Sequence, residues 1–189
     1  MPFGADAAQR YGLRLIETFG TLAAVLAAPR RCRDALLTDV PAMARHLTEV
    51  RAAMLHALKA EAVGGPRIAG TEALAAYLRA DMGYQPAEQL RILFLARDNG
   101  LLCDEVMQRG STDTITMLPR PIVHRALDLG ANGLILVHNH PAGNPEPSRA
   151  DLNATRELVL ACKQLEIIVH DHLIVAKGGW SSLRLMGLL

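Results

Sequence analysis

An apolar run that ends in two histidines, GLILVHNHPAGNPEPSRAD at residues 133–151, is the most informative part of the sequence. Its first five residues are apolar enough for a buried strand, which we expect to continue to His140. Successive strand residues point to opposite faces, so His138 and His140 project from one side and Asn139 from the other. Two imidazoles can therefore meet one ion at the carboxyl end of this strand, where open α/β sheets usually bind ligands.

A carboxylate that follows the two histidines completes a set of three metal donors. Asp151 is the third residue of a helix predicted from about Arg149 to Leu165, and a side chain in this first turn can swing back toward the histidines. Two imidazole nitrogens and one carboxylate oxygen at roughly 2.0–2.2 Å form a common zinc set that leaves a fourth position for water. Since bound zinc lowers the pKa of water toward ~7, the stretch predicts a catalytic zinc site.

A structural explanation of the same residues stays open. Ser148 and Asp151 also match a capping box, in which the two side chains bond backbone amides at the start of a helix. An isolated H-x-H pair has little specificity, because short motifs recur by accident. The metal hypothesis therefore depends on the histidines and the carboxylate occurring together.

Helices and strands alternate through the second part of the chain. The turn RDNG at residues 97–100 favours a hairpin, because Asn-Gly readily accepts positive φ angles. The predicted elements are a helix at 71–83, strands at 90–96 and 101–110, a helix at 119–130, a strand at 133–140, a helix at 149–165 and a strand at 166–176. This order predicts an α/β domain.

The first part of the chain is predicted to be a separate helical domain, residues 1–63. Its apolar residues recur at helical spacing, with Pro29 and Pro41 as breaks. The segment GGPRIAG, residues 64–70, concentrates glycine and proline where the helical pattern stops, so we expect a linker there. The second domain would then cover residues 71–189.

Composition fits a folded cytoplasmic protein. The 189 residues are 50% hydrophobic and 21% charged, and the net charge of +1 weakens, without excluding, DNA as a main partner. The cysteines (Cys32, Cys103 and Cys162) form no CxxC pair, so neither a disulfide framework nor a thiolate zinc knuckle is predicted. Because the chain shows no signal-peptide pattern and no apolar run near the ~20 residues that cross a bilayer, we expect no membrane association.

The segment HNHPAGNPEPSRAD fits the pattern H-x-H-x(7)-S-x-x-D, and on this motif the chain resembles the JAMM metalloproteases of the JAB/MPN superfamily. The surrounding stretches AEQLRILFL, NGLLCDEVMQRGST, LPRPIVHRAL and HDHLIV are similar to the RadC family, over about residues 66–189. The resemblance implies a JAB/MPN (cytidine-deaminase-like) α/β fold, a curved mixed β-sheet flanked by helices, with a small all-α domain before it.

The resemblance also implies roles for individual residues. It assigns zinc to His138, His140 and Asp151, and it places the Ser148 hydroxyl beside the metal, where it can assist the oxyanion. JAMM enzymes use a glutamate on the strand before the motif to take a proton from the zinc-bound water.

Two glutamates can fill this place. Glu88 is the preferred general base, because it corresponds to the JAMM glutamate when both chains are aligned element by element. Glu105, on the next predicted strand, is the alternative. A solvated charge at the end of a strand remains an explanation of either residue.

A second histidine pair, His170 and His172, alternates on the last predicted strand, but no carboxylate follows it at a useful spacing. Asp171-His172 resembles a recurrent Asp-His of the RadC family, which implies that His172 orients a ligand or closes the site. A buried histidine with an ordinary hydrogen-bond partner is the other explanation.

The implied activity is zinc-dependent hydrolysis of an amide or isopeptide bond in a protein or peptide. Two alternatives stay open: a DNA-repair or DNA-processing accessory, as RadC chains are traditionally labelled, and a catalytically silent interaction module. Many RadC relatives carry a Gly-x-Gly helix-hairpin-helix element that binds DNA phosphate, and this chain lacks it. The basic cluster Arg30, Arg31 and Arg33 is explained by a solvated helix end, a docking surface or a homodimer contact.

Overall fold

The computed structural model describes residues 4–65, 68, 70–110 and 117–189. The chain divides into two compact units between Leu58 and Lys59, and each is described by itself. The linker and domain boundaries expected at 64–70 stay a prediction. Across the described residues, no helix is both long and apolar enough to cross a membrane.

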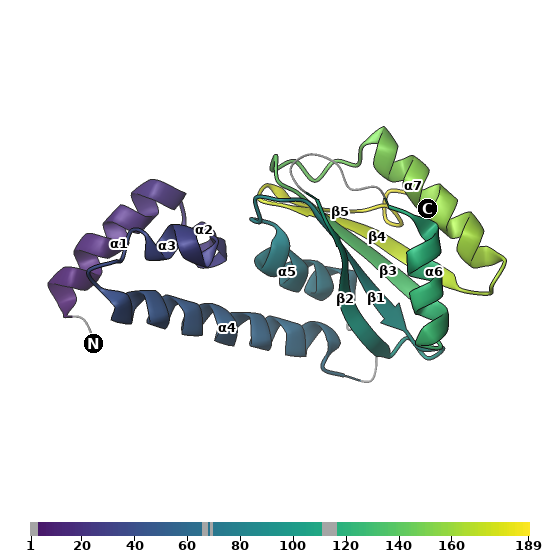
Figure 1. The fold of residues 1–189 in the computed structure, drawn as a ribbon, viewed down its shortest axis with the longest axis horizontal. Helices are drawn as coiled ribbons and strands as arrows, with labels where there is room; N and C mark the ends of the chain where they lie inside the picture. Colours follow the sequence, from purple (N-terminus) through teal and green to yellow (C-terminus); the bar gives the residue numbers. More distant parts are fainter. Residues whose placement is uncertain (1–3, 66–67, 69, 111–116) are drawn as a thin grey trace. The chain divides into compact units, whose positions relative to one another are not determined.

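The first unit is all-helical (Figure 1). Its helices are α1 (Ala5–Phe19), α2 (Leu22–Ala27), α3 (Arg30–Asp34) and the first part of α4 (Pro41–Val63). The two predicted breaks are confirmed, because Pro29 immediately precedes α3 and Pro41 begins α4. The core consists of apolar side chains from these helices and the loop between α3 and α4, among them Tyr11, Leu15, Val25, Leu37 and Met43.

The expected basic cluster is split by this packing. Arg33 is only 2% exposed, and its guanidinium donates to the carbonyl oxygen of Leu26 and the hydroxyl of Thr48, both at 3.2 Å. Arg30 instead lies at the surface and pairs with Asp34. Arg33 is therefore a structural residue of the helical unit rather than part of a solvated basic surface.

A mixed sheet forms the centre of the second unit, with the strand order β2-β1-β3-β4-β5 in the described residues (Figure 1). The strands are β1 (Gln89–Leu95), β2 (Leu101–Arg109), β3 (Gly133–His140), β4 (Ile168–Ala176) and β5 (Gly179–Ser182). β3 and β4 are parallel, whereas the other neighbouring pairs are antiparallel. The predicted hairpin is confirmed, since Asn99 between β1 and β2 has a φ of 66°. β5 was not predicted from the sequence, because it has only four residues.

Helices cover both faces of the sheet. α5 (Thr71–Met82) packs against β3, β4 and β5. α6 (Pro119–Asp128) and α7 (Arg149–Lys163) share a core with the other face, which includes Leu136 of β3, Ile122 of α6 and Leu158 of α7. The predicted fold class is confirmed: a mixed α/β sheet flanked by helices, preceded by a helical region.

Candidate metal centre

β3 carries two histidines to the end of the sheet. This strand lies between β1 and β4, and its residues are buried until the last one. The alternation of strand side chains sends His138 and His140 to the same side, as predicted, and their Nε2 atoms lie 2.8 Å apart. His138 is 2% exposed, whereas the side chain of His140 is 19% exposed. A turn with Gly143 at a φ of 94° then leads away from the strand.

The first turn of α7 supplies the carboxylate. Asp151 Oδ1 lies 3.3 Å from Nε2 of His138, and Oδ2 lies 3.5 Å from Nε2 of His140. The capping box is also present, because Ser148 Oγ accepts from the Asp151 amide at 3.1 Å. In return, Asp151 Oδ2 accepts from the Ser148 amide at 2.7 Å and from its hydroxyl at 2.6 Å. The helix cap thus fixes the orientation of the carboxylate that faces the histidines.

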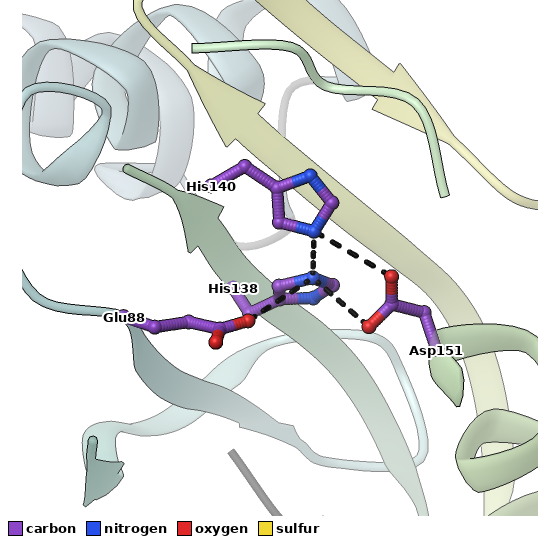
Figure 2. Close-up of side chains that lie close together, drawn as sticks. All are labelled: Glu88, His138, His140 and Asp151. Atoms are coloured by element: carbon purple, nitrogen blue, oxygen red, sulfur yellow. Dashed lines mark hydrogen bonds and ion pairs between the residues drawn. The ribbon is translucent and has the colours of Figure 1, made fainter. Parts of the chain in front are cut away.

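A glutamate approaches the same point from the start of β1. Glu88 Oε1 lies 3.8 Å from Nε2 of His138. Figure 2 shows Glu88 and Asp151 reaching the His138 ring from opposite sides. Donor atoms from the residues that we call the His–Asp–Glu cluster all lie within 4.8 Å of one another: Glu88, His138, His140 and Asp151.

The donor set and its spacing fit a divalent cation. His140 Nδ1 lies 2.8 Å from the carbonyl oxygen of Asn144, which can only accept, so Nδ1 carries the hydrogen and the neutral ring directs its Nε2 lone pair into the cluster. Tetrahedral zinc with bonds of 2.0–2.1 Å places its ligand atoms about 3.3 Å apart. The nitrogen–nitrogen and nitrogen–oxygen distances of 2.8, 3.3 and 3.5 Å bracket this value. The cluster could therefore hold a metal ion.

The electrostatics favour the metal-binding forms of His138 and Asp151. Burial lowers the pKa of His138 to about 4, so its ring is neutral at pH 7. Burial alone would raise the pKa of Asp151, but hydrogen bonds with His140 and Ser148 and the proximity of His138 hold it well below its usual range. The Asp151 carboxylate raises the pKa of His140 in spite of partial burial, so a proton on Nε2 of this ring would compete with a cation. The carboxylate is thus ionised and ready to bind a cation.

The alternative base and one histidine of the second pair lie away from the cluster. Glu105 Oε2 accepts from Arg125 Nε at 2.8 Å, on a half-exposed part of β2. A bulge in β4 leaves His170 out of the register with β3, so His170 and His172 do not share a face as the sequence indicated. His170 lines a pocket beside α5, whereas His172 lies against His138, with Nε2 2.8 Å from Nδ1 of His138.

One residue near the cluster was missed from the sequence. Asn139 is 0% exposed and points away from the metal donors. Its Oδ1 accepts from the amide of Gln89 at 2.9 Å, and its Nδ2 donates to the carbonyl of Ala87 at 3.1 Å. These bonds fix the backbone on both sides of Glu88. A polar residue within a buried apolar strand was the available signal, because such a side chain requires partners.

Comparisons with known proteins cover the residues of this site. The family model for the RadC-like JAB domain matches residues 68–188, which contain the five strands of the described residues and every member of the His–Asp–Glu cluster. A protein of Rhodobacter capsulatus named "UPF0758 protein" is 41% identical over 180 residues, which cover 93% of this chain and 82% of that protein. The family match extends over more than half of the chain, and the aligned relative extends the similarity to the helical unit. The chain therefore belongs to the RadC-like JAB domain family.

Proposed function

We propose that the chain is a zinc-dependent hydrolase of the metallopeptidase or isopeptidase type, which cleaves an amide bond in a protein or peptide. The observation that carries this proposal is the convergence of two imidazoles and two carboxylates within 4.8 Å. Three of these groups would suffice to hold zinc, and the fourth, Glu88, would then lie beside the position left open for water. This division of roles is typical of a catalytic site rather than a structural one.

His138, His140 and Asp151 would hold the ion. Zinc bound there would supply a Lewis acid and a water molecule of lowered pKa. The capping box keeps the Asp151 carboxylate in position, and the carbonyl of Asn144 keeps the His140 ring in the tautomer that coordinates through Nε2.

Glu88 is the proposed general base. Its Oε1 is 3.8 Å from Nε2 of His138, farther than the 3.3 Å of Asp151 Oδ1, which suits a group that contacts a water molecule instead of the ion. The carboxylate would take a proton from the attacking water and deliver it to the leaving amine. Glu105 is the weaker candidate, because it is engaged with Arg125.

Ser148 is proposed to assist the reaction from the rim of the site. Its hydroxyl donates to Asp151 in the structure, so its first role is to hold that carboxylate. A rotation of the Ser148 side chain would release the hydroxyl toward the developing oxyanion. Asp151 would still accept from the backbone amide of Ser148 during this change.

Incubation of the purified chain with a panel of peptides and isopeptide-linked substrates tests the proposal. We expect cleavage that a chelator abolishes and added zinc restores, and that Glu88→Gln lowers at least 100-fold, as for loss of a general base, typically ~10²–10⁴. Glu105→Gln is the matched control and should keep full activity. Cleavage that survives both the chelator and Glu88→Gln would contradict the proposal.

A further inference from the structure

A chain of hydrogen bonds lies behind the first metal-facing histidine. His138 Nδ1 is 2.8 Å from His172 Nε2, and His172 Nδ1 is 2.7 Å from the Oγ1 of Thr155. The Thr155 hydroxyl lies 2.6 Å from the backbone carbonyl of Asp151, one turn earlier on α7. All three side chains are buried, with at most 2% exposed. The chain thus begins at the backbone of one proposed ligand and ends at the ring of another.

The position of each hydrogen in these bonds follows from the backbone carbonyl of Asp151, at which the chain of bonds begins. A carbonyl oxygen only accepts, so the single hydroxyl hydrogen of Thr155 must point to Asp151. The Thr155 oxygen is then the acceptor for His172, and the hydrogen of that pair lies on His172 Nδ1. A ring with no exposed surface is favoured in its neutral form, which leaves His172 Nε2 with a bare lone pair.

The hydrogen between His172 and His138 is placed in the same way. Because His172 Nε2 accepts, the hydrogen between the two rings belongs to Nδ1 of His138. A neutral His138 then has no hydrogen on Nε2, the atom that faces His140 and Asp151. The opposite tautomer would direct an N–H group at the position of the cation.

We infer that Thr155 and His172 are positioning residues that fix His138 in the tautomer with Nε2 free to coordinate a metal ion. This inference rests on the proposed metal site and deepens it. Thr155 supplies no donor atom to the cluster, yet the loss of its hydroxyl would remove the group that orders both rings. Partners that orient a ligand in this way typically contribute about 10–100-fold to metal affinity.

The variant Thr155→Val tests the inference, because it removes the hydroxyl and keeps the shape of the side chain. We expect zinc to bind about 10–100-fold more weakly than to the wild type, measured by competition with a chromophoric chelator. Thr155→Ser keeps the hydroxyl and should restore wild-type affinity. His172→Gln can still accept from His138 and should bind zinc more tightly than His172→Leu. Equal zinc affinity in Thr155→Val and Thr155→Ser would overturn the inference.

Long-range proton–nitrogen NMR spectra of the metal-free protein give a second readout, which needs neither zinc nor a substrate. We expect the His138 proton on Nδ1 in the wild type, and a loss of this preference in Thr155→Val. A His138 proton found on Nε2 in the wild type would overturn the inference. If the spectra are as expected but the wild type binds no zinc, the proposed function fails while the assigned hydrogen-bond chain stands.

Discussion

The variant Asn139→Ala should loosen the segment that carries Glu88 without disturbing the proposed ligands. It removes the bonds of 2.9 and 3.1 Å to the backbone of Gln89 and Ala87. A buried polar group left without a partner costs about 1–3 kcal/mol, so two such groups cost about 2–6 kcal/mol. Because this segment is partly exposed and water can replace some of the loss, we expect a decrease of about 2–4 kcal/mol in the free energy of unfolding.

Urea unfolding and hydrogen exchange measure this effect together. The amide of Gln89 should exchange faster in Asn139→Ala, since the side chain that accepts its hydrogen is gone. Zinc affinity should stay within a few-fold of the wild type, because Asn139 does not contribute a donor to the cluster. Asn153→Ala, at an exposed position of α7, is the matched control and should leave stability nearly unchanged. A stability loss below about 1 kcal/mol, or unaltered exchange at Gln89, would refute this account of Asn139.

Three further predictions concern other parts of the chain. Burial raises the pKa of the Cys162 thiol to about 11, so only about a thousandth of it is thiolate at pH 8. Mass spectrometry should therefore find native Cys162 unlabelled by iodoacetamide, while the exposed Cys32 reacts. Arg33→Ala should lower the free energy of unfolding by about 1–3 kcal/mol, since it removes two hydrogen bonds of a buried side chain. Arg31→Ala at the surface should change it by less than about 0.5 kcal/mol in the same urea titration. Glu105→Gln removes a half-exposed ion pair and should cost at most about 1 kcal/mol in thermal unfolding, with zinc binding unchanged.

The part of the fold closest to the site was also the easiest to predict. The apolar run of β3 has clear limits, and the strand was predicted at 133–140, where the structure places it. The convergence of His138 and His140 follows from the two-residue period of a strand. The position of Asp151 follows from the start of α7. These features depend on local geometry, which the sequence carries directly.

Features that depend on contacts between distant residues could not be predicted in the same way. The bulge in β4 separates His170 from His172, although their spacing suggested a shared face. The choice between Glu88 and Glu105 needed the family resemblance, because either residue can lie at the end of a strand. The partners of Asn139 come from a segment about 50 residues earlier in the chain. Pairing of this kind is decided by tertiary packing and leaves little trace in local periodicity.

The cation site is tested most directly by elemental analysis of the protein purified with zinc present, before and after His138→Ala. We expect about one zinc ion for each wild-type chain and almost none for the variant, because zinc needs at least three protein ligands here. His124→Ala, which changes an exposed histidine of α6, should keep the wild-type content. Equal zinc content in His138→Ala and the wild type, or a wild-type chain without bound metal, would contradict the central claim.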